Sequence, residues 1–394
     1  MSKIDDLIKQ YCPNGVEYKE LGDILDYEQP TRYIVKSARY DSNADTPVLT
    51  AGQTFILGYT FEKDGIYKAS KKNPVIIFDD FTTSYHWVDF NFKVKSSAMK
   101  MLRPKPDFDG IFKYVLYAMG EIHYSPQDHA RQWISQYSKF KIPVPHPRVQ
   151  EEIVRVLDAF TALEAELEAE LEARKRQYEY YRNKLLTFDE NTTGGGIDWK
   201  ILSEVFDIKN GYTPSKANKE FWKNGTIPWF RMEDIRENGR ILNDSIQHIT
   251  PQAVKGGKLF PANSIIVATT ATIGEHALIT VDSLANQQFT CLSKKVNRYN
   301  ELDMKFFYYY MFVIDEWCKN NTNVSGFASV DMNKLKKLMI PIPPIEEQER
   351  IVAILDKFDS LVNDISEGLP AELTARRQQY EYYRNKLLTF DEAA

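Results

Sequence analysis

Short hydroxyl side chains follow two apolar runs of the sequence, and their types suit the recognition of a polar ligand. The run PVIIF, residues 74–78, leads into Asp79–Tyr85 (DDFTTSY), and SIIVA, residues 264–268, leads into Thr269–Gly274 (TTATIG). Hydroxyls can bind phosphate oxygens and the groove edges of base pairs. The same loops could equally be ordinary polar turns, and the sequence leaves that choice open. The candidates in the two loops are Thr82, Thr83, Ser84, Thr269, Thr270 and Thr272.

Amide and guanidinium groups elsewhere add hydrogen-bonding chemistry that distinguishes bases. Asn and Gln can pair with adenine, and Arg can pair with guanine, through two hydrogen bonds each. The tyrosine-rich stretches Tyr178–Tyr181 and Tyr308–Tyr310 favour core or helix-interface positions over base stacking. The candidates in the segments that carry these groups are Gly52, Gln53, Arg231, Asn286, Gln287 and Gln288.

Catalytic patterns are missing from the sequence. It contains no GxxxxGK[ST] phosphate loop, and its six histidines show no HExxH spacing. Asn73–Val75 departs from the (N/D/S)PP(Y/F) tetrapeptide of amino-methyltransferases. Carboxylate–x–lysine occurs at Glu17–Lys19 and Asp198–Lys200 without a partner carboxylate, so a structural strand is the favoured interpretation. Asp79–Asp80 could bind a metal, although a polar turn is the commoner role. These residues predict recognition, with no catalytic and no metal site.

Composition indicates a soluble protein in a reducing compartment. The 394 residues are 43% hydrophobic and carry a net charge of −5, which allows two ordinary cores. Three cysteines at unrelated spacings fit neither a disulfide framework nor a zinc site. No apolar run approaches the roughly 20 residues of a membrane span. The acidic excess lies in residues 146–197 and 344–394, so the remaining stretches are free to face DNA. We expect a cytoplasmic protein that does not bind a membrane.

The chain is a tandem duplication. QYEYYRNKLLTFDE occupies Gln177–Glu190 and recurs letter for letter at Gln379–Glu392. IPVP and IPIP, at residues 142–145 and 340–343, are each followed by an IV..LD.F run, and GVEYKELGDIL from residue 15 matches GIDWKILSEVF from residue 196. Each half therefore runs from an opening segment through a globular part and a proline-rich hinge to a long helix. A chain with two such halves is suited to hold two related binding targets at a fixed separation.

The two hinges lead into long amphipathic helices. Apolar residues recur every three or four positions over about 40 residues in each half, the pattern of a coiled-coil stripe. An exposed stripe of this length would aggregate, so the helices are expected to pack on each other in antiparallel orientation; two unrelated surface helices are the alternative. Gly368–Pro370 should kink the second helix. The globular parts combine short β-rich runs with helices such as FKYVLYAM, which predicts α+β domains.

On these motifs the sequence resembles the specificity subunits of bacterial type I restriction–modification systems. The doubled hinge and helix carry the resemblance, together with NGYTPSK (210–216), ATTATIG (268–274), ANQQF (285–289) and the SGFASVDMNKLKKLMIPIP run from Ser325. LEAELEAELEAR from Leu163 resembles the tetrapeptide repeats of one branch of that family. The first half lacks NGxTP and has ARQWISQY (130–137) in place of GFASVDMN, which leaves its contact residues less well defined.

The resemblance implies an α+β protein with two target-recognition domains, related by pseudo-two-fold symmetry and separated by two long antiparallel coiled-coil spacer helices. The recognition domains would span residues 1–145 and 191–343, the latter with its linker, and the helices 146–190 and 344–394. Each domain would read half of an asymmetric, interrupted double-stranded DNA target. The chain itself would not be catalytic.

Partners also follow from the resemblance. Two methyltransferase subunits would dock on the helices, and restriction subunits would join the full complex. This chain would hold no cofactor, with S-adenosylmethionine, ATP and Mg²⁺ on the partner subunits in a bacterial cytoplasm. The motifs add the DNA-contact candidates Arg131, Lys209, Tyr212, Ser325 and Ser329. The repeat block adds the docking candidates Tyr178, Arg182, Lys184, Tyr380, Arg384 and Lys386.

Two other functions compete with this one. A coiled-coil interaction scaffold would use the helices without binding DNA, and it would show no salt-dependent affinity for random-sequence DNA. A fusion of methyltransferase and specificity functions would bind S-adenosylmethionine by itself, but the chain lacks room for a cofactor domain.

Overall fold

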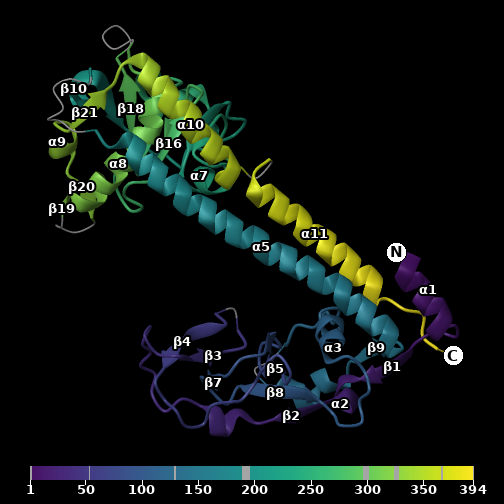
Figure 1. The fold of residues 1–394 in the computed structure, drawn as a ribbon. Helices are drawn as coiled ribbons and strands as arrows, with labels where there is room; N and C mark the ends of the chain where they lie inside the picture. Colours follow the sequence, from purple (N-terminus) through teal and green to yellow (C-terminus); the bar gives the residue numbers. More distant parts are fainter. Residues whose placement is uncertain are drawn as a thin grey trace. The chain divides into compact units, whose positions relative to one another are not determined.

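The computed structural model describes residues 2–52, 54–127, 130–188, 196–295, 301–323, 328–364 and 367–393, and these form two compact units (Figure 1). The first unit combines Met1–Glu168 with Leu373–Ala394, and the second is Ala169–Glu372. Each unit contains one globular part and portions of both helical stretches. The units therefore do not coincide with the two halves of the sequence duplication.

The first unit is built on a sheet in the order β2-β8-β5-β6 and a smaller sheet in the order β4-β3-β7. The apolar run at residues 74–78 forms the central strand β5 (Val75–Asp79), which is buried over its first four residues. Ile76 and Phe78 pack in one core with α3 (Phe112–Met119), and Val75 and Ile77 pack in a second core on the other face. The remaining elements are α1 (Ser2–Tyr11), β1 (Glu17–Glu20), α2 (Leu21–Ile24), β2 (Leu25–Glu28), η1 (Pro30–Tyr33), β3 (Thr46–Leu49), β4 (Ile56–Thr60), β6 (Tyr85–Val88), β7 (Lys93–Val94), β8 (Met99–Pro104), α4 (Gln132–Ser135), η2 (Tyr137–Lys139) and β9 (Lys141–Val144).

The second unit repeats this plan with a sheet in the order β11-β18-β15-β16-β13 and a smaller one in the order β14-β12-β17. Strand β15 (Ser264–Ala268) is fully buried, and α8 (Met304–Asn320) packs on the same core with the predicted core tyrosines Tyr308–Tyr310. The remaining elements are β10 (Asp198–Ile201), α6 (Leu202–Val205), β11 (Phe206–Asn210), η3 (Lys219–Phe221), β12 (Ile227–Phe230), α7 (Met232–Asn238), β13 (Ile241–Leu242), β14 (His248–Ile249), η4 (Pro251–Ala253), η5 (Lys255–Gly257), β16 (His276–Ile279), β17 (Leu284–Ala285), β18 (Phe289–Lys294), β19 (Thr322–Asn323), β20 (Ser329–Val330), α9 (Met332–Leu335) and β21 (Met339–Ile342).

Both proline-rich hinges are strands. Strand β9 pairs with β1, and β21 pairs with β10, so the carboxylate–x–lysine segments are confirmed as structural strands. The glutamine after each hinge ties the next helix to the globular part. Gln150 donates to Pro145 O and accepts from Ile111 N, both at 2.7 Å, and Gln348 makes the same pair of bonds in the second unit.

The first long helix is confirmed, and the second is interrupted. Helix α5 (Pro147–Leu186) runs for 40 residues and contributes to both units. The second stretch is two helices, α10 (Ile345–Asn363) and α11 (Leu369–Leu388). The prediction at Gly368–Pro370 is a kink in one continuous helix. It is wrong to that extent, because one helix ends before Pro370 and a new helix starts. Proline fits the first turn of α11, where its missing N–H is not needed.

The helices pack through aromatic rings in each unit. In the first unit Phe160 lies 6.3 Å from Tyr380 and 5.5 Å from Tyr383 between ring centres, while Arg377 binds Glu164 and Glu168 at 2.6 and 2.5 Å. Later residues of α5 meet earlier residues of α11, so the predicted antiparallel packing is confirmed there. In the second unit Phe358 makes the matching ring contacts, at 6.2 and 5.6 Å.

Two composition-based expectations can be checked within the described ranges. Cys12, Cys291 and Cys318 are free thiols. None of the helices in these ranges is both long enough and apolar enough to cross a membrane.

Candidate nucleic-acid interface

In the second unit, three neighbouring strands of the large sheet end at one edge, and the predicted loops meet there. Strand β11 ends at Asn210, β15 ends at Ala268, and β18 begins at Phe289. Thr269 N donates to Gln288 O at 2.9 Å, and Gly211 N donates to Phe289 O at 2.8 Å. The antiparallel order β11-β18-β15 thus brings loops that are distant in sequence to a common edge.

Further contacts tie these loops together. Thr213 Oγ1 forms a hydrogen bond with Gln287 Oε1. Val330 N donates to Thr269 O at 2.9 Å, which brings strand β20 to the same edge. The sequence candidates that the fold gathers at this edge are Tyr212, Thr269, Thr270, Gln287, Gln288 and Ser329.

Arg231 lies beside this edge at the start of α7. Its backbone N donates to Asp234 Oδ2 at 2.7 Å, which caps the helix. Asn286 N donates to Phe230 O at 3.0 Å, so Arg231 is next to the 285–288 loop. The guanidinium carbon is 5.8 Å from the centre of the Trp229 ring, which limits the directions the side chain can take.

Two other candidates of the second unit, Thr272 and Lys209, are not among the residues gathered by these contacts. Thr272 lies in a tight loop whose preceding residue, Ala271, has a φ of 61°. Thr272 Oγ1 is buried and makes no hydrogen bond within the described residues. A non-glycine residue in this backbone region stores strain of roughly 1–3 kcal/mol, which is common at binding sites. Lys209 is exposed on β11, where it pairs in register with Cys291.

The matching edge of the first unit also brings candidates together. Strand β5 opens into a turn at Thr82–Ser84, in which Thr83 has a φ of 60°. Asp79 Oδ1 accepts from the backbone of Phe81 and Thr82, each at 2.9 Å, so the polar turn predicted at Asp79 is confirmed. On the next strand, His86 Nε2 lies 3.2 Å from Gly52 O, so Gly52 lies beside the strand that leaves this turn.

The two edges share a backbone frame. Asp80 N donates to Ala98 O at 2.7 Å, and Asp80 O accepts from Gln132 N at 2.8 Å. Thr269 makes the same two backbone bonds in the second unit, each at 2.9 Å. Asp80 and Thr269 therefore occupy equivalent positions, one residue beyond the buried central strand of each unit.

Different side chains stand on this common frame. In the first unit Asp80 forms an ion pair with Lys100 at 3.2 Å, with both side chains 1% exposed, and Arg131 lies 3.8 Å from the same carboxylate. In the second unit the Thr269 and Thr290 hydroxyls lie 3.0 Å apart at that place. Asp80 is thus a buried structural anion, and the described residues include no group of three or more His, Cys, Asp and Glu side chains that could hold a metal.

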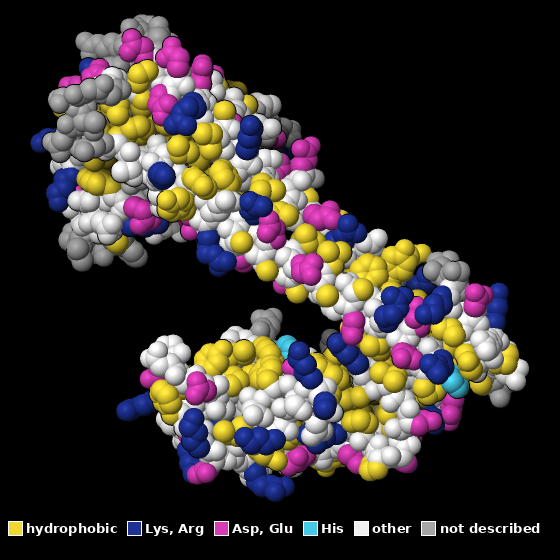
Figure 2. Space-filling model, viewed as in Figure 1, with side chains coloured by type: hydrophobic (Ala, Val, Ile, Leu, Met, Phe, Trp, Pro, Cys, Tyr) yellow, Lys and Arg dark blue, Asp and Glu magenta, His cyan; other side chains and the backbone are white. Residues whose placement is uncertain are grey.

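Exposed apolar side chains accompany the first unit's edge. Figure 2 shows a hydrophobic patch over the β3–β4 part of this unit. Ile56, Tyr59, Phe61 and Phe90 are the large exposed apolar residues of this region, which follows Gly52 in sequence. Apolar groups of this kind can contact the thymine methyl group or a base face.

Two DNA-contact candidates, Gln53 and Ser325, lie outside the described residues.

The docking candidates divide into buried and exposed positions. Tyr178 is 4% exposed and packs on Phe358, and Tyr380 makes the matching contact with Phe160, so both tyrosines join helices within a unit. Arg384 is bound by Glu121 at 2.6 Å, and Arg182 lies over the Phe312 ring. Lys184 and Lys386, in contrast, are exposed.

Sequence reasoning missed the most exposed aromatic pair of the repeat block. Tyr180 and Tyr382 are 60% and 61% exposed at the same position of the two copies. Their position outside the apolar stripe could have predicted this exposure, since a tyrosine there does not pack in the helix interface. The exposed face of each copy is lined by Glu179, Tyr180, Asn183 and Lys184, and by Glu381, Tyr382, Asn385 and Lys386.

Together, the fold and these edges define a protein that repeats one α+β frame and equips each copy with a different set of polar side chains. The chain matches the type I restriction modification DNA specificity domain family over residues 13–173 and 196–375. It therefore belongs to that family, as a specificity subunit. Such subunits determine the DNA target sequence of a type I restriction–modification system and are not themselves catalytic.

Individual relatives agree with this assignment. The chain is 47% identical to the type I restriction enzyme EcoR124I/EcoR124II specificity subunit of Escherichia coli, over 99% of this chain and 98% of that one. Its fold is similar to the S subunit of M. genitalium, at 15% identity, a TM-score of 0.56 and coverage of 95% and 96%. A chain from a type I R-M complex gives 18% identity, a TM-score of 0.58 and coverage of 95% and 98%.

Proposed function

We propose that each unit reads one half of an asymmetric, interrupted double-stranded DNA target. The observation that supports this most directly is the shared backbone frame with different side chains on it: the buried pair Asp80–Lys100 beside Arg131 in the first unit, and Thr269, Thr290 and Ser329 in the second. Arg131 lies with hydroxyl side chains in the first unit, whereas Arg231 lies with hydroxyls and with the amides of Gln287 and Gln288 in the second, so the two sets favour different bases. One frame used twice thus recognises two different half-sites.

The proposed reading groups lie on loops that a rigid sheet holds in place. In the second unit these are Thr270, Gln287, Gln288 and Arg231, and in the first unit they are Thr82–Ser84 and Arg131. Lys209 and Tyr212 suit phosphate contacts that set the register. We also propose residues 1–145 and 191–343 as the recognition domains, each completed by ends of the helices at 146–190 and 344–394, in the cytoplasm where the DNA is.

We propose that the helices dock two methyltransferase subunits, through which restriction subunits join. The support is the identity of the exposed residues in the two copies of the repeat block, because core packing does not require identity at positions that face solvent. Two copies of one patch suit two copies of one partner. S-adenosylmethionine, ATP and Mg²⁺ would belong to those partners.

Alanine substitutions at the second unit's edge test the division of the target. Thr270→Ala or Gln287→Ala should weaken recognition of one half-site by about 1–3 kcal/mol per lost base contact and leave the other half-site unchanged. Sequencing of methylated adenines in a strain that carries each variant would show which half-site loses stringency. Arg148→Ala, an exposed arginine in the first turn of α5, serves as the control and should change neither half. Equal loss at both half-sites would contradict the proposal.

A further inference from the structure

An arginine of the repeat block is bound by a carboxylate in one unit, whereas its counterpart has no carboxylate partner among the described residues of the other unit. In the first unit Arg384 Nε donates to Glu121 Oε1 at 2.6 Å, and Asn385 Nδ2 donates to Glu121 Oε2 at 3.1 Å. The matching arginine of the second unit is Arg182, and its Nε is buried and makes no hydrogen bond to any of the described residues. The same atom of the same sequence block is thus satisfied once and unsatisfied once, which is costly for a buried donor.

The missing carboxylate can be traced to one position. Lys113 on α3 and Lys305 on α8 each form an ion pair with an aspartate of the following long helix, at 2.9 and 3.2 Å. Counting eight residues on from each lysine gives Glu121 in the first unit and Val313 in the second. Val313 is 38% exposed and offers no acceptor.

The neighbouring residue supports this equivalence. A Cβ placed on Gly120 would lie 3.7 Å from the guanidinium carbon of Arg384. Phe312 stands at the corresponding place in the second unit, and its ring centre is 3.9 Å from the guanidinium carbon of Arg182. The two arginines therefore approach the same point of the frame. One meets a carboxylate there, and the other rests on an aromatic ring.

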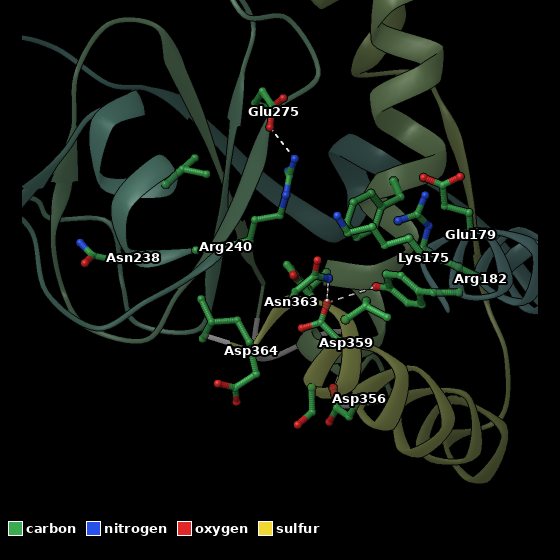
Figure 3. A pocket seen from close by; sticks show the side chains of 18 of the residues that line it. Lys175, Glu179, Arg182, Asn238, Arg240, Glu275, Asp356, Asp359, Asn363 and Asp364 are labelled. Atoms are coloured by element: carbon green, nitrogen blue, oxygen red, sulfur yellow. Dashed lines mark hydrogen bonds and ion pairs between the residues drawn. The ribbon is translucent and has the colours of Figure 1, made fainter. Parts of the chain in front are cut away.

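Arg182 lines a pocket of about 850 Å³ that lies within the second unit (Figure 3). Its walls are contributed by α5, α7, α8 and α10 together with Glu275. Other charges of the pocket are engaged: Glu275 binds Arg240 at 2.5 Å, and Asp359 accepts from Asn363 at 2.8 Å. Within the described residues neither Arg182 nor Arg236 of this pocket forms an ion pair, and Arg182 is the one of the two that belongs to the repeat block.

We infer that this pocket receives a carboxylate side chain of a methyltransferase subunit, which Arg182 and Asn183 bind as Arg384 and Asn385 bind Glu121. The inference rests on the proposed docking of methyltransferase subunits. It deepens that proposal, because it assigns one contact that only the second unit can make. The first unit has already filled the equivalent position with a side chain of its own.

The surroundings of the pocket suit a protein carboxylate. Its rim continues into the exposed face of α5 at Glu179, Tyr180 and Lys184, which is part of the proposed docking surface. The arriving carboxylate draws the guanidinium from the Phe312 ring into a charge-assisted hydrogen bond, which is the stronger interaction. Carboxylates also line this pocket. Asp356 is paired with Lys305 at 3.2 Å and Asp359 accepts from Asn363, while repulsion from the exposed Glu179 and Glu237 is screened by solvent.

Val313→Glu tests the inference by supplying the internal carboxylate. In this variant Arg182 is occupied, so one of the two methyltransferase subunits should bind about 10- to 100-fold more weakly to the full-length chain, as expected for a lost charged hydrogen bond. Arg182→Ala should weaken the same binding step to a similar extent. Adding Val313→Glu to Arg182→Ala should cause no further loss, because both changes remove one contact. Stepwise dissociation constants from titration calorimetry, with masses from light scattering, measure these effects.

Val313→Gln is the matched control, since it has the size of glutamate without its charge, and it should bind both methyltransferase subunits as the wild type does. Equal Tm values for all variants would show that folding is intact. If the wild type binds two methyltransferase subunits and both Val313→Glu and Arg182→Ala do the same with unchanged constants, the inference is wrong and the proposed function stands. A wild-type chain that binds none would contradict the proposed function itself. Weaker DNA binding with normal methyltransferase binding would assign the pocket to a phosphate and overturn the inference.

Discussion

Asp80 and Thr269 illustrate how one position serves two kinds of chemistry. Each follows the buried central strand of its unit and makes the same two backbone hydrogen bonds. Asp80 is joined to Lys100 with both side chains 1% exposed, and it also accepts from Trp133 N at 2.9 Å. Thr269 needs only the hydroxyl of Thr290. Burial of the charged pair carries a desolvation free energy that the hydroxyl pair avoids. The Asp80 carboxylate also holds Arg131 beside the edge of the sheet.

A prediction at this scale compares a single with a double substitution. Asp80→Ala should destabilise the protein by roughly 3–5 kcal/mol, because it leaves Lys100 buried and unpaired. The double variant Asp80→Thr/Lys100→Thr removes both charges and introduces the pair that the second unit already holds on this frame. It should therefore lose less stability than the single variant, although it changes more residues. Urea unfolding followed by circular dichroism measures the difference.

The double variant also tests how Arg131 is held. Base stringency at one position of the first half-site should fall, because Arg131 loses the carboxylate that orients it. A double variant less stable than Asp80→Ala would show that the frame requires the charged pair.

At the scale of elements, the two long helical stretches differ in continuity, because the second is broken between α10 and α11. Helix α5 is continuous for 40 residues, whereas its counterpart ends at Asn363 and restarts at Leu369. Gly368 permits this break, since a Cβ there would lie 2.4 Å from Ser360 O and 2.8 Å from Asp364 O. A proline alone would kink a continuous helix. The close packing of Gly368 against carbonyl oxygens allows one helix to end and the next helix to begin.

Gly368→Ala should therefore be destabilising by about 1–3 kcal/mol, because the methyl group meets backbone oxygens that cannot move aside. Gly52→Ala is the control, since its nearest non-neighbouring atom is a side-chain oxygen at 3.5 Å. The control should remain within about 0.5 kcal/mol of wild type. Urea midpoints of the two variants provide the comparison, and equal midpoints would show that the close approach at Gly368 is relieved without cost.

At the scale of the whole molecule, α5 is shared between the two units. Its residues up to Glu168 belong to the first unit, and those from Ala169 belong to the second. The LEAELEAELEAR stretch from Leu163 crosses this boundary as continuous helix. The length of α5 therefore fixes how many helical residues join the two units along the chain.

One added LEAE tetrad should lengthen the unread gap of the DNA target by one base pair. Four helical residues advance about 6 Å and turn about 40°, whereas DNA advances about 3.4 Å and turns about 34–36° per base pair. Rotation should decide, because a domain that faces the wrong side of the duplex loses every base contact, while a few ångströms of stretch can be absorbed. Methylome sequencing of a strain with the insertion measures the gap, and altered half-sites would contradict the idea of a ruler.

Local sequence was sufficient for the elements and for the class of protein. Apolar runs and helix-like patterns located β5, β15 and α3, and the repeat of spacings predicted α5 over its full length. Loops at strand ends supplied most of the candidates that the fold gathers at the two edges. These features depend on near neighbours in the chain, which is why pattern alone predicts them.

Tertiary structure decided which distant segments meet. The two copies of QYEYYRNKLLTFDE have the same propensities and the same apolar stripe, so nothing local tells them apart. The fold places the second copy in the first unit, where Arg384 meets Glu121, and the first copy in the second unit, where Arg182 meets Phe312. Identical side chains acquire different roles because their partners lie 263 and 130 residues away in the sequence, and only the packed core brings those partners into contact.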